Sequence, residues 1–133
     1  MDGVWEGTYS CAQGNTGLSL FVSGQADGRL RTVFYFYPTP DNPMVPVGCF
    51  WMSGTYDATT GEADFAAGQW ILRPAGFVTV DLAGTVDARL TRMSGDVDGP
   101  GCDTFSLRHV AAASRPAPAA CRPAPDVMAS IGG

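Results

Sequence analysis

The sequence predicts an all-β protein, an eight-stranded antiparallel up-and-down β-barrel with a Pro-rich flap and an extended C-terminal tail. Three observations support this fold class. Apolar and polar residues alternate with a period of two along most of the chain. No segment has the 3.6-residue period of an amphipathic helix. Short segments rich in Gly, Asp, Asn and Pro separate the alternating segments, as expected of hairpin turns.

The bulk properties exclude two classes of partner. The chain has 133 residues, enough for one domain with a real core, and a net charge of −5. All eight basic residues are arginines, scattered among more numerous acids. Nucleic acids bind to clustered cations, so we expect no nucleic-acid partner. No apolar run approaches the roughly 20 residues that span a bilayer, so we expect no membrane span.

The first predicted strand shows the alternation clearly. Its inward face carries Trp5, Gly7, Tyr9 and Cys11, and its outward face carries small or polar residues. The second, sixth and eighth strands alternate in the same way. Their inward residues are Leu18, Leu20 and Val22, then Val78, Val80 and Leu82, then Phe105 and Leu107. In chain order we expect strands at 4–11, 17–23, 29–37, 49–57, 63–72, 77–86, 88–97 and 103–109.

The third and fourth strands are apolar on both faces. We place Phe34, Phe36, Phe50 and Met52 inward. This choice leaves an outward aromatic cluster, Tyr35, Tyr37 and Trp51. Exposed aromatic clusters often mark an interaction face, here for a protein segment. The alternative is that the flap or the C-terminal tail covers the cluster, since Pro-rich segments pack on aromatic strips.

Two segments interrupt the strand pattern. Residues 38–48 contain four prolines and are long for a hairpin connection, so we expect a stiff flap. Residues 110–133 are rich in Ala and Pro and cannot form a central strand. The predicted organisation is therefore a barrel domain at 1–109 and an extended tail or linker at 110–133, with a larger parent protein as one partner of the tail.

The opening segment carries a resemblance. Gly3-Val4-Trp5, followed by Gly7-Thr8-Tyr9, resembles the Gly-x-Trp start of lipocalins and avidins, the calycin barrels. The resemblance implies a closed barrel in which Trp5 closes one end. The later lipocalin motifs and the avidin biotin-contact pattern are absent, so the resemblance carries over the architecture and Trp5 alone.

The barrel interior is predicted to be either a solid core or a cup for one small apolar ligand, because an eight-stranded barrel is just wide enough for either. Three glycines, Gly7, Gly54 and Gly84, would leave room for a ligand. The candidate ligand-binding residues are the large inward side chains: Trp5, Tyr9, Phe34, Phe36, Phe50, Met52 and Trp70.

The four cysteines favour disulfides. Strand alternation brings Cys11, Cys49 and Cys102 to one rim, and Cys121 lies in the tail. No C-x-x-C pair supports a metal site, and no adjacent cation or His supports a reactive thiol. Among the three complete pairings we favour Cys49–Cys102 across the mouth. Paired cysteines would place the protein in a secreted or periplasmic compartment, and unpaired ones in the cytoplasm.

The function predicted from these features is a non-enzymatic binding module. It would hold a small apolar molecule in the barrel mouth or a protein segment on the aromatic face. We expect no cofactor and no metal, because His109 is alone and no catalytic motif is present. The alternatives are a structural accessory domain with a solid core and, less favoured, a small barrel enzyme such as an isomerase or cyclase.

Overall fold

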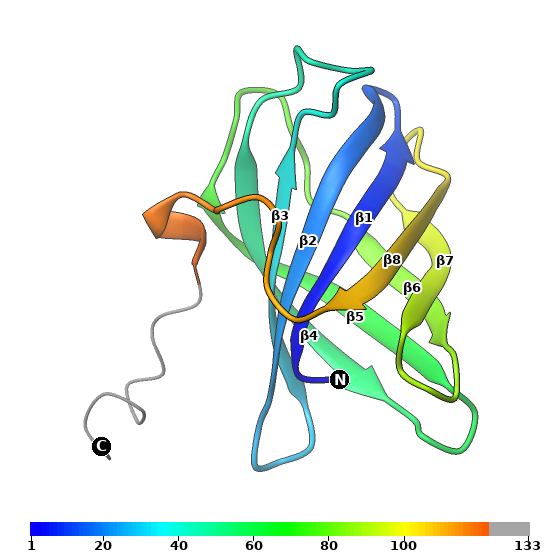
Figure 1. Ribbon diagram of the computed structural model, residues 1–133. Coiled ribbons are helices and arrows are strands. Elements are labelled where there is room, and N and C mark those ends of the chain that lie inside the picture. Colours follow the sequence, from blue (N-terminus) through cyan, green and yellow to red (C-terminus); the bar gives the residue numbers. More distant parts are fainter. Residues whose placement is uncertain (123–133) are drawn as a thin grey trace.

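The computed structural model describes residues 1–122, and within them eight antiparallel strands close into a barrel (Figure 1). The predicted fold class is therefore confirmed. The strands are β1 (Gly3–Cys11), β2 (Gly14–Gly24), β3 (Leu30–Tyr37), β4 (Gly48–Tyr56), β5 (Glu62–Leu72), β6 (Asp81–Val86), β7 (Arg92–Asp98) and β8 (Thr104–Val110).

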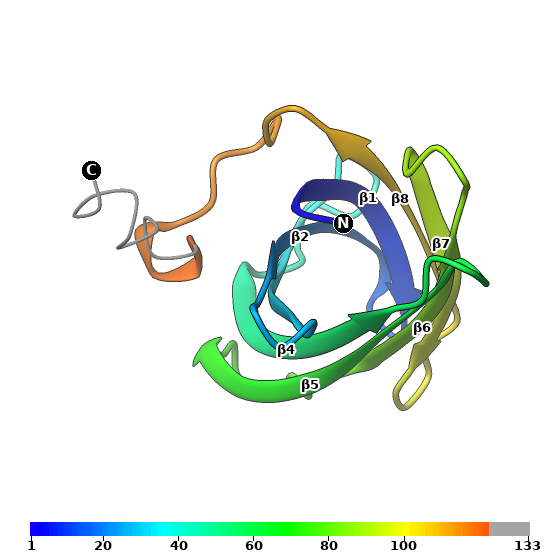
Figure 2. The same cartoon turned by 90° about the horizontal axis from the view of Figure 1, so that it is seen from below.

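Each strand pairs with its neighbours in sequence, and β1 pairs with β8 to complete the ring (Figure 2). Because the strands alternate in direction, the barrel has two distinct ends. We call the end reached by Cys11 the mouth, at the top of Figure 1, and the end at which β1 begins the base. Closure gives every strand a partner on both sides, as in other up-and-down barrels, although the second half of β5 pairs with β4 alone.

The strand boundaries differ from the prediction mainly around β6 and β7. The predicted strand at 77–86 begins only at Asp81, because β5 pairs with β6 through just four residues, Glu62 to Phe65. Residues 73–80 instead form a loop at the mouth. The Asp81 carboxylate accepts the backbone N–H of Ala67 at 2.8 Å, in place of a ladder hydrogen bond. Val78, predicted to point inward, is therefore 54% exposed.

The turn before β7 explains the second difference. Residues 88–91, predicted as part of a strand, form the β6–β7 turn. The Asp87 carboxylate accepts the backbone N–H groups of Thr91 and Arg92 at 2.6 and 3.1 Å. Asp at the start of a turn commonly makes such bonds, so the chain reverses before β7 begins at Arg92.

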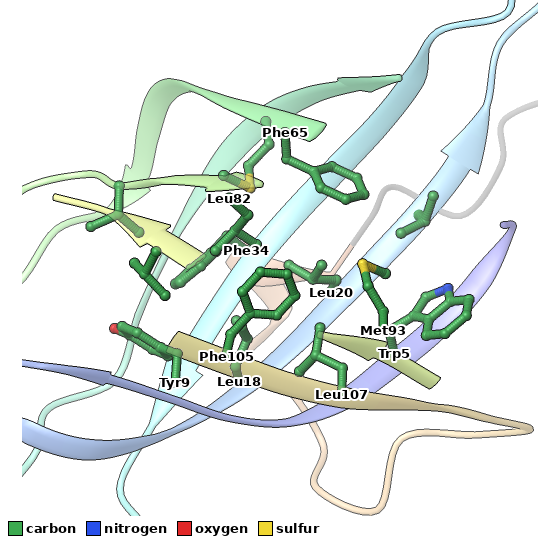
Figure 3. Close-up of a cluster of buried hydrophobic side chains, with 14 of the residues drawn as sticks. Trp5, Tyr9, Leu18, Leu20, Phe34, Phe65, Leu82, Met93, Phe105 and Leu107 are labelled. Carbon is green, nitrogen blue, oxygen red and sulfur yellow. The ribbon is translucent and has the colours of Figure 1, made fainter. Parts of the chain in front are cut away.

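The inward faces of the strands form one hydrophobic core (Figure 3). The predicted inward residues of β1, β2, β3, β4 and β8 lie in or against this cluster. Val33, Tyr35 and Tyr37 belong to a second cluster on the outer face of β3, as predicted for these positions. Alternation thus identified the inward face of these five strands correctly.

Gly7, Gly54 and Gly84, which were predicted to leave room for a ligand in the interior, do not do so. A Cβ on Gly7 would lie 2.0 Å from the backbone oxygen of Ser106. On Gly54 and Gly84 it would lie 2.5 and 2.7 Å from the rings of Phe65 and Phe105. The room at these positions is occupied by neighbouring backbone and aromatic rings, so these glycines serve close packing.

All four cysteines are in disulfides, but the pairing predicted across the mouth is wrong. Cys11 bonds to Cys102, and Cys49 bonds to Cys121. The physical reason is alternation: Cys49 precedes the inward-facing Phe50 and so points outward, where it cannot reach a thiol of the interior cluster. Cys11 and Cys102 both pack against that interior cluster.

The segment after β8 runs along the outside of the barrel (Figure 2). We call residues 111–122 the strap. It is extended around Pro118, with φ −54° and ψ 151°, and ends in the 3₁₀ turn Ala119–Cys121. The barrel ends at Val110, one residue after the predicted boundary. Residues 123–133 of the predicted tail lie outside the described residues.

Candidate ligand site in the barrel mouth

The mouth contains a cavity of about 410 Å³ between β1, β3, β4 and the 73–80 loop. Five aromatic rings contribute to its wall. Apolar side chains of the loop and the Cys11–Cys102 disulfide complete the lining. The aromatic residues are Tyr9, Phe34, Phe36, Phe50 and Phe77, and the others are Cys11, Ala12, Gln13, Gly76, Val78, Val80, Pro100 and Cys102.

The aromatic wall is held together by its own ring contacts. Phe34 stacks on Phe50 with centroids 4.6 Å apart, and the Tyr9 ring meets Phe34 edge-on at 5.1 Å. Phe77 stacks on Phe36 at 5.2 Å, with the ring planes 10° apart. Offset-stacked and edge-to-face pairs are the favoured aromatic arrangements. The rings are therefore fixed in place before any ligand arrives.

The base of the barrel is solid. Trp5 is fully buried, and its ring stacks on His109 with centroids 4.3 Å apart and planes parallel within 1°. Its indole Nε1 donates to the backbone oxygen of Met1 at 2.9 Å. Met93 and Leu107 pack between Trp5 and the mouth (Figure 3). Trp5 thus lies at the base end, as the calycin resemblance implies.

The predicted ligand-binding residues therefore separate into three groups. Tyr9, Phe34, Phe36 and Phe50 line the cavity. Trp70 stands behind them, with its ring edge-on to Phe50 at 5.1 Å. Trp5 and Met52 are buried in the core and do not line the cavity.

Sequence reasoning missed Gln13 and Phe77 as cavity residues. Gln13 lies in the tight β1–β2 turn, and Phe77 follows the Pro-Ala-Gly turn at 74–76. The position of Gln13 two residues after the inward-facing Cys11, on the same face by alternation, was the available signal. For Phe77 there was none, because its loop takes the place of a strand that the alternation predicted.

The mouth has few polar side-chain atoms, and hydrogen bonds connect them to one another. Gln13 Nε2 donates to Tyr9 Oη at 3.3 Å and to Thr16 Oγ1 at 3.1 Å. Burial raises the pKa of the Tyr9 phenol well above its usual value, and the hydrogen bond from Gln13 opposes this only in part. The Tyr9 hydroxyl is therefore neutral at physiological pH. Within residues 1–122, no cationic or anionic side chain lines the cavity.

The flap crosses the mouth end as residues 38–47. Asn42 Nδ2 donates to the backbone oxygens of Gln13 and Asn15 at 2.7 and 2.9 Å, which ties the flap to the β1–β2 turn. Val45 is buried in the interior cluster. Met44 points away and is 88% exposed. The flap is thus anchored at the rim of the cavity.

The predicted interaction face on the outside of β3 and β4 is covered by the strap. Tyr35 and Tyr37 are buried beside Ala117 and Cys121, and Trp51 is half-buried against the same cluster. The Arg115 guanidinium lies 5.0 Å above the Tyr37 ring, a cation–π distance. The segment that occupies this face is therefore part of the chain itself.

A second, polar groove of about 330 Å³ lies where the strap leaves β8. Its one buried acid, Glu6, accepts the backbone N–H and the hydroxyl of Ser114 at 3.0 and 3.1 Å. Arg108 lies opposite Glu6 in the β1–β8 pair. These contacts hold the start of the strap against the barrel.

Residues 1–122 contain no cluster of three His, Cys, Asp or Glu side chains arranged for a metal ion. In the same described part of the chain, no helix has the length and apolarity of a membrane span. Comparison of the chain with protein-family models, with curated proteins and with solved structures gave no match. The geometry of the mouth is therefore the basis for the function proposed below.

Proposed function

We propose that this protein is a non-enzymatic binding module that holds one small, apolar, ring-containing molecule in the barrel mouth. The observation that carries the proposal is the aromatic cavity of about 410 Å³ above a solid base. Ligand pockets usually measure roughly 300–1,000 Å³, are mostly apolar and are formed before the ligand binds. The barrel order and the Gly3-Val4-Trp5 segment support a calycin-like kinship, in which such mouths hold ligands.

The size and chemistry of the cavity limit the ligand. The described part of the wall offers aromatic faces and no charged side chain, so burial of apolar area supplies most of the affinity, at about 25 cal/mol per Å². The gain per non-hydrogen atom falls to roughly 0.3 kcal/mol for drug-sized ligands and is larger for smaller ones. At about 0.3–0.5 kcal/mol per atom, a bicyclic molecule of about 13 non-hydrogen atoms has a dissociation constant of roughly 20 µM to 1 mM.

The two disulfides support an oxidising location for this activity. Disulfides persist in secreted and periplasmic proteins and are rare in the cytosol. We therefore place the binding module in a secreted or periplasmic setting, where a small lipophilic molecule needs a carrier in water.

The proposal is tested with 1-aminoanthracene, a neutral polycyclic probe that fluoresces more strongly when it leaves water. We expect saturable binding at one site of the wild-type protein. Val78→Trp adds a large ring at a half-exposed position in the cavity wall and should weaken binding about tenfold or more by filling the mouth.

Ala88→Trp is the matched control, because it adds the same ring in the exposed β6–β7 turn at the base. It should leave the affinity within a factor of about two, since it is remote from the mouth. The absence of saturable binding to the wild type, or an equal loss in both variants, would contradict a ligand site in the mouth and favour a structural domain.

A further inference from the structure

A chain of hydrogen bonds links Tyr9, Gln13 and Thr16 at the mouth and determines the direction in which each hydroxyl and amide proton points. The Thr16 hydroxyl donates its single proton to the backbone oxygen of Gly14 at 3.1 Å. The oxygen of that hydroxyl must therefore accept from Gln13, and Gln13 Nε2 is the group within reach, at 3.1 Å. This assigns the orientation of the Gln13 amide, with its nitrogen toward both Thr16 and Tyr9.

The Tyr9 hydroxyl consequently acts as an acceptor toward Gln13, at 3.3 Å. Its own proton remains unused by the protein. Among residues 1–122, the hydrogen bond from Gln13 is the one that the Tyr9 hydroxyl makes, and it is accepted, not donated. Tyr9 is only 4% exposed and lines the aromatic cavity, so the unused donor belongs to a mostly apolar wall.

An unused hydrogen-bond donor in an apolar cavity discriminates between ligands that carry an acceptor and ligands that do not. A ligand with a suitably placed acceptor recovers a hydrogen bond that it had with water, and an acceptor-free ligand leaves the proton unpaired. A neutral acceptor suits this cavity better than a carboxylate, because none of the described residues that line the wall is a cation that could balance a charge.

We propose that Tyr9 is the specificity-determining residue of the mouth, and that the ligand class is a neutral aromatic molecule carrying a carbonyl oxygen toward the β1–β2 turn. This inference rests on the proposed function. Gln13 is a positioning residue in this account, because its amide turns the Tyr9 proton away from the turn and toward the ligand.

The test uses two probes of nearly identical shape, 2-acetylnaphthalene and 2-isopropenylnaphthalene. They differ in one group, a C=O in the first and a C=CH₂ in the second. Both are titrated into the wild type, Tyr9→Phe and Tyr56→Phe by calorimetry. Tyr56→Phe is the matched control, because Tyr56 ends β4 at the base, away from the cavity.

We expect Tyr9→Phe to weaken binding of the ketone about three- to tenfold, the range for one neutral hydrogen bond, and to leave the hydrocarbon within about twofold. Unchanged hydrocarbon affinity shows that the cavity itself is intact. Tyr56→Phe should change neither probe.

Two other outcomes would overturn the inference in distinguishable ways. If both probes bind the wild type and Tyr9→Phe affects them equally, the cup exists but Tyr9 does not select a carbonyl. If neither probe binds the wild type, the proposed function fails and the role of Tyr9 fails with it.

Discussion

The side chains of Trp5 and Tyr9, four residues apart, both point inward from β1, but one is packed in the core and the other lines the cavity. Trp5 stacks on His109 in the solid base, whereas Tyr9 meets Phe34 edge-on and borders the cavity. Alternation predicts that both point inward and cannot tell which of them borders a space. That difference depends on residues brought by β8 and β3, far away in the sequence.

Replacement of Trp5 should affect stability more than binding. We expect Trp5→Ala to lower the free energy of unfolding by about 3–5 kcal/mol, because it leaves a cavity in the packed base. Trp5→Phe should cost less, since a ring still faces His109. Urea unfolding measures both. Folded Trp5→Phe should bind 1-aminoanthracene like the wild type, and loss of that binding would place the ligand at the base instead.

The buried tyrosines predict a loss of stability at alkaline pH. Burial raises the pKa of Tyr9, and that of Tyr37, above the usual value of 10.0. Above pH 10 the unfolded chain releases these protons while the folded protein keeps them, so the free energy of unfolding falls as pH rises. Below pH 10 this contribution is fully present.

Urea unfolding at a series of pH values from 8 to 11 measures the effect. Tyr9→Phe should show a shallower decline above pH 10 than the wild type, because one of the two shifted phenols is gone. An identical decline in Tyr9→Phe and the wild type would show that the Tyr9 phenol is not shielded from water.

At the scale of elements, the long paired strands were predictable and the connections were not. The alternation located β1 to β5 and β8 closely because each is paired with at least one neighbour along most of its length. Residues 77–80 alternate equally well but have no strand partner. Alternation reports burial of one face, and it contains no information about hydrogen-bond partners.

The two disulfides have different structural roles, which can be tested separately. Cys49–Cys121 holds the strap on the outer face, and Cys11–Cys102 forms part of the cavity wall. They join residues 72 and 91 positions apart. The loop-closure model therefore assigns each of them a similar stabilisation, about 4 kcal/mol.

Removal of each bond by paired Cys→Ala substitutions tests this division. We expect both double variants to lose stability in thermal melts. Cys49→Ala/Cys121→Ala should also admit elastase to the small residues Ala119 and Ala120, with unchanged ligand affinity. Cys11→Ala/Cys102→Ala should weaken ligand binding. Equal loss of affinity in both would show that the strap supports the mouth.

At the scale of the whole molecule, the architecture was more predictable than the site. Barrel closure follows from eight alternating strands joined mostly by short turns, which are local features of the chain. The cavity depends on how the Phe77 loop and the Cys11–Cys102 bond meet over Tyr9. Such contacts join segments from both ends of the chain, and a pattern of alternation cannot specify them.

The most direct test of the central claim is a map of backbone amide shifts in a ¹⁵N-labelled sample titrated with 2-acetylnaphthalene. A ligand in the mouth predicts concentrated shifts at Gln13, Phe77 and Val80, with little change at Leu90 and Met93 near the base. Shifts confined to the strap and the outer face of β3, or no shifts at saturating probe, would contradict a binding site in the barrel mouth.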